Sequence, residues 1–332
     1  MSKIMSISHN KRLWIFILSF KIILISSLTW LVYDKIWIVN QELNFFFNFY
    51  EKIKEGKHLI FFLLCILLVP FNWIIETIKW KKLINNFQNI EWTQAYRAVM
   101  TGISLGIITP ARIGEYGGRL LYITTANRNK ALFAHFIGSM SQNLPILFFG
   151  ALGSFFFFRE YYLHSWILAT GFSIFILILS LLVYFLFSQN EMAYFFLSNV
   201  PLLNKIFKQK NYLLFKPKTL QEVITLSTIR YFIYAAQYIS LLYMFDIKMN
   251  LFEAIIGVSV IYLFQTGIPM PPALSILLRT ELALVIWSRF STDQVSILTV
   301  PILLWVINLL LPGIYGAYVL LTSNLNKYFN EN

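Results

Sequence analysis

The chain has 332 residues, of which 58% are hydrophobic and 13% are charged. Soluble domains are about 45–50% apolar and about 25% charged, so this composition excludes an ordinary soluble domain and indicates an integral membrane protein. The formal net charge is +12. Because the lysines lie in short loops between apolar runs, we expect this charge to set the orientation in the membrane and not to bind nucleic acid.

Apolar segments long enough to cross a bilayer, which takes about 20 residues, recur along the chain. We expect spans at 13–33, 58–78, 131–157, 165–188, 221–245 and 294–321. Two other regions, 93–128 and 250–290, each hold two shorter apolar pieces separated by Pro or Gly. Each predicts a helical hairpin that enters the membrane and returns, with two ordinary short spans as the alternative. The predicted fold class is all-α, a polytopic helical membrane protein.

The charge of the loops predicts which side each one faces. The N-terminal arm and the segments 79–97, 128–130 and 189–218 are strongly basic, whereas 34–57 balances four lysines against four acids. Basic loops face the cytoplasm. With six spans and two hairpins, every basic loop falls on that side, so we expect both termini to be cytoplasmic in a protein of the cell (inner) membrane.

The order of spans and hairpins is the same in two halves of a single membrane domain, 1–332. The halves are about 1–160 and 161–332, and each contains three crossings and one hairpin. An odd number of crossings turns the second half upside down relative to the first. The stretches "TPARIGEYGGRLL" and "PPALSILLRTELAL" also share Pro-Ala followed by Arg and Glu. The sequence therefore predicts an inverted repeat, which alternating-access transporters use, with sites near the midplane.

The first hairpin carries an unusual density of charge for a membrane segment. Arg112, Glu115 and Arg119 are spaced i, i+3 and i+7, which puts them on one helical face. Glu115 can pair with one arginine, so one guanidinium is left for an anion such as a lipid phosphate. A solvated loop between spans is the alternative. We expect Pro110, Gly114, Gly117 and Gly118 to break the helix here, and the three glycines also to allow close approach of another helix or an acyl chain.

The second hairpin and the spans add further polar candidates. The expected breaks are at Pro269, Pro271 and Pro272. Of Arg279 and Glu281, Arg279 is the better candidate to bind an anion. The two side chains do not share a helical face, because they are only two residues apart. Snorkelling of Arg279 to the interface is the alternative. Within spans, we expect Gln142 and Asn143 either to face a cavity or to join helices by hydrogen bonds, and Arg230 either to face a cavity or to snorkel to the interface.

The stretch "GIITPARIGEYGGRLLYI", followed later by "GIPMPPALSILLRTELAL", resembles the transmembrane region of lysylphosphatidylglycerol synthases, a family also called flippase-like. Pro110, Gly114, Glu115 and Arg119 fall on the family's Pro–Gly–Glu–Arg pattern, whereas "ALSILL" replaces the glycines usual in the second motif. The resemblance would cover nearly the whole chain. It implies a membrane domain that moves or binds phospholipid, with the two hairpins meeting near the centre. It does not imply aminoacyl transfer, which in the full-length synthases belongs to a separate soluble domain.

The leading functional hypothesis is a translocase for an anionic lipid or a lipid-linked substrate, working by alternating access and not as an enzyme. The alternatives are a non-transporting partner of a lipid or polysaccharide enzyme, and a membrane-embedded enzyme acting on lipid. The four histidines lack metal-ligand spacing and no Walker A motif is present. We therefore predict no metal and no cofactor. The expected partners are membrane phospholipid and either a second copy of the chain or a partner enzyme.

Overall fold

The computed structural model describes residues 45–109, 112–161, 166–200, 214–267 and 275–323, together with the isolated Ser26. These residues form helices and connecting turns, with no strand among them, which confirms the predicted fold class. The expected span 13–33 lies outside the described residues.

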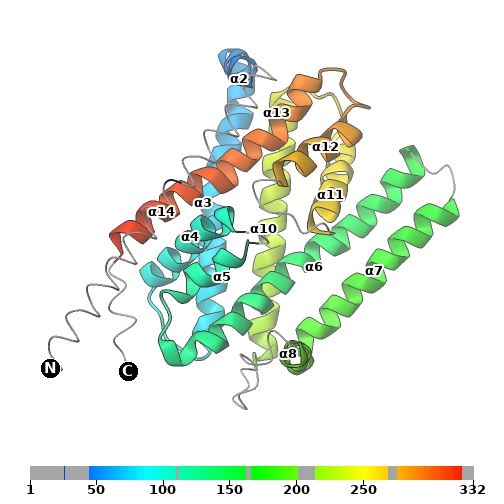
Figure 1. Ribbon diagram of the computed structural model, residues 1–332. Coiled ribbons are helices and arrows are strands. Elements are labelled where there is room, and N and C mark those ends of the chain that lie inside the picture. Colours follow the sequence, from blue (N-terminus) through cyan, green and yellow to red (C-terminus); the bar gives the residue numbers. More distant parts are fainter. Residues whose placement is uncertain are drawn as a thin grey trace, which may run out of the picture.

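Two long antiparallel helices lie side by side at the centre of the molecule (Figure 1). They are α3 (Gly56–Ile84) and α10 (Pro217–Met244). Ion pairs join them at both ends: Lys52, on α2 (Phe45–Lys54), contacts Asp246 just beyond α10 at 2.6 Å, and Lys82 contacts Glu222 at 2.6 Å. One ion pair therefore lies at each of the two opposite ends of the pair formed by α3 and α10.

Each predicted hairpin is a pair of short helices. The first consists of α4 (Trp92–Ile108) and α5 (Ile113–Leu120), which pack closely together. The second consists of α11 (Leu251–Gly267) and α12 (Ser275–Trp287). At 1.5 Å per residue α5 is roughly 12 Å long, well short of the ~30 Å hydrocarbon core. An α5 of this length cannot cross the bilayer alone, which favours the hairpin over two ordinary short spans for the first region; its entry into the membrane stays a prediction.

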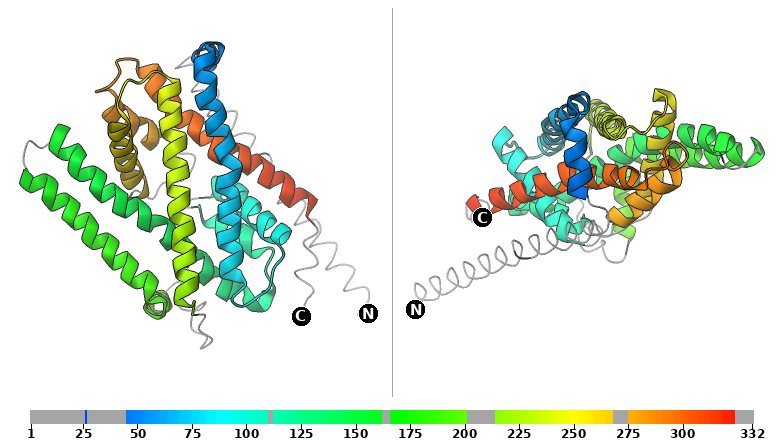
Figure 2. Two further views of the ribbon diagram at one scale, coloured as in Figure 1. Left: turned by 180° about the vertical axis from the view of Figure 1, so that it is seen from behind. Right: turned by 90° about the horizontal axis from the view of Figure 1, so that it is seen from above.

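The remaining long helices flank this centre. They are α6 (Arg128–Tyr161), which the 3-10 turn Thr125–Asn127 precedes, α7 (Trp166–Ser188) and the continuous helix made of α13 (Gln294–Trp305), a π-helical turn (Val306–Leu310) and α14 (Leu311–Thr322). The short helix α8 (Asn190–Asn199) follows α7 at one end of the bundle (Figure 2). Large apolar side chains on α3 and α7 are exposed, as in a protein surrounded by lipid; they include Ile60, Leu63, Leu67, Ile167 and Leu181.

Four described helical stretches are long and apolar enough to cross a membrane: His58–Ile84, Thr125–Glu160, Trp166–Ser188 and Gln294–Thr322. They match four of the predicted spans. The segment 221–245 lies on α10, which is long enough but is not among the four. The segment 221–245 includes Arg230, Gln237 and several tyrosines, and the side chains of Arg230 and Gln237 are buried. These inward-facing polar groups lower the hydropathy of the segment, and its crossing of the membrane stays a prediction.

The two halves pack on each other reciprocally. The helix that follows the first hairpin, α6, packs against α11 of the second hairpin, and the helix that follows the second hairpin, α14, packs against α4 of the first. In Figure 1, α4 and α5 lie beside the lower part of the central helices, and α11 and α12 beside the upper part. Each half therefore packs against the hairpin of the other half, and both hairpins lie against the centre of the bundle.

Candidate functional site

A buried carboxylate on α3 lies at the centre of the charged residues. Glu76 is 5% exposed and contacts three cations. Its Oε1 lies 2.8 Å from Arg119 Nη2, and its Oε2 lies 2.8 Å from Lys79 Nζ. The same Oε2 also accepts a hydrogen bond from Arg230 Nη1. One side chain therefore links the first hairpin to both central helices.

Three charged residues on and just before α5 form a continuous chain of ion pairs. Arg119 Nη2 donates to Glu115 Oε1 at 2.6 Å, and Arg112 Nε lies 3.4 Å from Glu115 Oε2. Arg119 also lies over the ring of Trp80, 5.1 Å from its centroid. Arg112 precedes α5 with a left-handed backbone (φ 57°), a conformation that costs an arginine free energy and that clusters at functional sites. The predicted proximity of these residues is confirmed.

Arg230 joins α10 to α3 and α6. Its Nε donates to Asn72 Oδ1 at 2.8 Å, and its Nη1 donates to Gln142 Oε1 at 3.1 Å. Lys79 Nζ also donates to Gln142 Oε1, at 3.4 Å. Gln142 therefore accepts from two buried cations, so it joins helices as well as facing the site.

These side chains line a cavity of about 530 Å³ between the two hairpins and the central helices. The volume is within the range of small-molecule sites, about 300–1,000 Å³. Aromatic rings from both halves, among them Trp73, Tyr234, Tyr262 and Trp305, form part of the wall. The charged residues of the wall are Glu76, Lys79, Arg112, Glu115, Arg119, Arg230 and Arg279.

Seven of the eight predicted binding residues lie on this cavity, and the chain brings them together from four helices and the turn before α5. They are Arg112, Glu115, Arg119, Gln142, Asn143, Arg230 and Arg279. The eighth, Glu281, is exposed on α12 and is not part of the wall. Whether the seven bind a substrate stays a prediction.

The residues predicted to break the first hairpin divide into two groups. Pro110 lies outside the described residues, as do Pro269, Pro271 and Pro272 of the second hairpin. Gly114, Gly117 and Gly118 do not break the chain, because α5 runs through all three. A Cβ on Gly114 would lie 2.2 Å from Leu105 O and one on Gly118 2.7 Å from Gly102 Cα, whereas one on Gly117 would meet no atom within 4 Å. Two of the three therefore allow close packing of α5 on α4.

The sequence analysis missed Glu76, and it assigned Lys79 to a basic loop. Both lie on α3, which continues to Ile84, and Lys79 is 3% exposed. The predicted span stopped at residue 78 because Lys79 and the lysines after it were expected in a loop outside the membrane. A usable signal was present, because Asn72, Glu76 and Lys79 are spaced i, i+4 and i+7 and so share one helical face.

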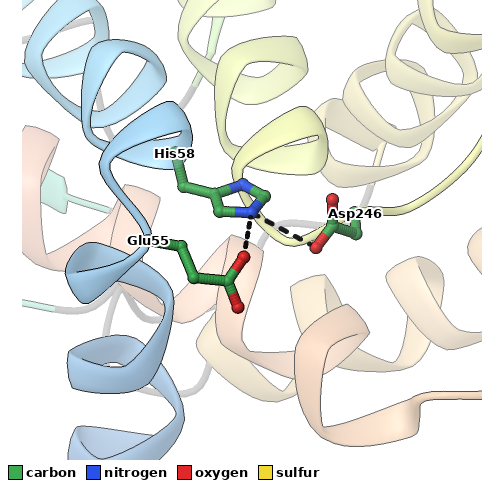
Figure 3. Close-up of side chains that lie close together, drawn as sticks. All are labelled: Glu55, His58 and Asp246. Atoms are coloured by element: carbon green, nitrogen blue, oxygen red, sulfur yellow. Dashed lines mark hydrogen bonds and ion pairs between the residues drawn. The ribbon is translucent and has the colours of Figure 1, made fainter.

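A second polar cluster lies at the end of the bundle near α2 (Figure 3). His58 Nε2 lies 2.9 Å from Glu55 Oε2 and 3.4 Å from Asp246 Oδ2. Such a set of donors could hold a metal ion. The Lys52 ammonium, 2.6 Å from the same Asp246 oxygen, already supplies a cation there. The cluster joins the start of α3 to the end of α10, two positions that are far apart in the sequence.

A family model described as the lysylphosphatidylglycerol synthase TM region matches residues 45–316. The chain belongs to this family. The matched segment contains every described residue of the cavity wall. Neither the comparison with curated proteins nor the comparison with solved structures finds a match. The match is to the membrane region of lysylphosphatidylglycerol synthases and not to a catalytic domain, in agreement with the resemblance seen in the sequence.

Proposed function

We propose that this member of the family moves an anionic lipid, or a lipid-linked substrate, across the membrane by alternating access. The observation that carries the proposal is the polar cavity of about 530 Å³ inside a bundle with an exposed apolar surface. Ionisable groups at membrane depth are costly and usually serve a substrate or ion pathway.

The arrangement of the halves supports this function. Both hairpins contribute charged residues to one cavity, Arg112, Glu115 and Arg119 from the first and Arg279 from the second. The helix after each hairpin packs on the opposite half. A rocking movement of one half against the other would expose the cavity to each side in turn, as inverted-repeat transporters do.

Blocking the cavity tests the proposal directly. Cys65 is fully buried and can be replaced by alanine to give a background without cysteine. In that background, Asn143→Cys places a thiol on the cavity wall, and Leu181→Cys places one on α7, where the side chain is 67% exposed. Each protein is reconstituted into liposomes with fluorescent phosphatidylglycerol, and dithionite bleaching measures how much lipid has changed leaflet.

We expect a bulky methanethiosulfonate reagent to stop lipid movement in the Asn143→Cys protein and to leave the Leu181→Cys protein active. Equal movement in both labelled proteins would reject a route through the cavity. If the unlabelled protein moves no lipid, including phosphatidylcholine, the translocase proposal fails. The result would then favour a non-transporting partner of a lipid or polysaccharide enzyme.

A further inference from the structure

Arg279, which is partly buried, differs from the two buried arginines of the cavity. Arg119 and Arg230 each contact Glu76, whereas no ion pair or hydrogen bond joins Arg279 to any described residue. Its Nε is buried without a partner, and the side chain lies on the cavity wall. A guanidinium has five donors in a planar fork that fits phosphate, so Arg279 is set up to bind an anion from the cavity.

Asn308 offers a second unused group on the same wall. It is 6% exposed, and neither its Nδ2 nor its Oδ1 has a partner among the described residues. It lies in the π-helical turn between α13 and α14, an irregularity that is frequent at functional sites. Leaving a buried amide unpaired is unfavourable, and a ligand with acceptor oxygens would satisfy its N–H groups.

The cavity as a whole carries an excess of positive charge. Its wall holds five cations, Lys79, Arg112, Arg119, Arg230 and Arg279, but only two carboxylates, Glu76 and Glu115. Arg112 shares Glu115 with Arg119, and its own ion pair is 3.4 Å long. Arg112 and Arg279 come from opposite hairpins and line the same cavity. A phosphodiester lipid headgroup brings one negative charge, whereas a terminal phosphate brings up to two charges and three acceptor oxygens.

We propose that Arg279 and Asn308, which line the same cavity as Arg112 of the first hairpin, bind a terminal phosphate, and that the substrate class is a lipid that ends in a phosphomonoester or diphosphate. The lipid source of this phosphate rests on the proposed function. The binding site itself rests on the two unpartnered side chains and the excess positive charge.

Binding selectivity tests the site. The purified protein is titrated with phosphatidic acid, and in parallel with phosphatidylglycerol of the same acyl chains, and native mass spectrometry measures the bound fraction. Glycerol 3-phosphate and inorganic diphosphate serve as water-soluble probes. We expect phosphatidic acid to bind at least about tenfold more tightly than phosphatidylglycerol, because its phosphomonoester adds a second negative charge and a third free acceptor oxygen to the charge-assisted contact. Arg279→Gln and Asn308→Leu should each remove most of this preference, and Arg279→Lys should keep part of it.

The matched control is Arg97→Gln, which removes an exposed arginine of α4 that is not on the cavity wall. It should leave the preference unchanged. A loss of selectivity is interpreted only for variants that have the same melting temperature as the parent protein. This requirement is realistic for Arg279, which gives up no described ion pair when it is replaced.

Equal binding of the two lipids, or a preference that survives in both Arg279→Gln and Asn308→Leu, would overturn the proposal. Tight binding of the soluble probes without lipid binding would overturn the lipid source. If selective binding is found but no lipid moves in the liposome assay, the proposed function fails and the phosphate site stands. If lipids move with no preference for a terminal phosphate, the phosphate site fails and the proposed function stands.

Discussion

Glu76 places one buried carboxylate among three buried cations. Its side chain is 7% exposed, and those of its partners Lys79, Arg119 and Arg230 are between 3% and 7% exposed. Removing the charge of one partner from a buried ion pair is strongly destabilising, since the remaining charge loses its compensation. Here a single carboxylate compensates cations from α3, α5 and α10, so its loss affects three elements together.

We predict that Glu76→Gln lowers the free energy of unfolding by about 3–5 kcal/mol, because three buried cations lose their shared partner. Differential scanning fluorimetry in detergent measures the effect. The control is Glu222→Gln, which breaks the Lys82 pair at the exposed end of the same two helices and should leave the melting temperature almost unchanged. A double variant with Lys79→Met should recover part of the loss. A Glu76→Gln protein as stable as the parent would show that the cluster does not hold the helices together.

At the scale of the element, glycines decide how closely the first hairpin packs. A Cβ on Gly118 would lie 2.7 Å from Gly102 Cα and 2.8 Å from Thr101 C, both backbone atoms that cannot rotate away. Gly117, on the same helix, faces open space. The two adjacent glycines therefore differ in their importance for the packing of α5 on α4, although both lie within α5.

We predict that Gly118→Ala destabilises the protein by about 1–3 kcal/mol, because α5 must move away from α4 to admit the methyl group. Gly117→Ala should be neutral or stabilising by up to about 1 kcal/mol, since alanine is the better helix former. Thermal unfolding of the two variants gives the comparison. Equal effects at both positions would contradict the close packing of α4 and α5. Because Arg119 follows Gly118 directly, the Gly118 variant should also weaken lipid movement.

The sequence predicted the elements better than their ends. Apolar length and the position of charge located both hairpins and four of the spans. The charge of Lys79 ended the span 58–78 too early, because a composition rule cannot see that Glu76 pairs with this lysine inside the bundle. Composition also could not predict the unpaired amide of Asn308, because Asn308 lies in a π-helical turn that no periodicity of the sequence predicts. A sequence signal does exist: "QNLP" on α6 and "NLLLP", which runs from the π-helical turn into α14, place Asn143 and Asn308, both on the cavity wall, shortly before a proline.

At the scale of the whole molecule, the two ends of the bundle differ in charge. Lys82 and Glu222 mark one end, where Lys81, Lys216 and Lys218 also lie on or next to α3 and α10. At the other end, the single positive charge of Lys52 meets the two carboxylates of Glu55 and Asp246, and α13 begins beside α2. The segments 79–97 and 128–130 and the described parts of 189–218, which the sequence placed on one side, therefore meet at one end of the described structure (Figure 1).

This asymmetry predicts the orientation in the membrane, because loops rich in Lys and Arg stay in the cytoplasm. In the cysteine-free background, Lys218→Cys reports on the basic end and Thr292→Cys on the opposite end; both side chains are exposed. We expect a membrane-impermeant maleimide to label Thr292→Cys in intact cells and to label Lys218→Cys only after permeabilisation. The opposite pattern would invert the proposed topology. Labelling of both from outside would mean that α10 does not cross the membrane, and the cavity that it lines would then lie near the surface.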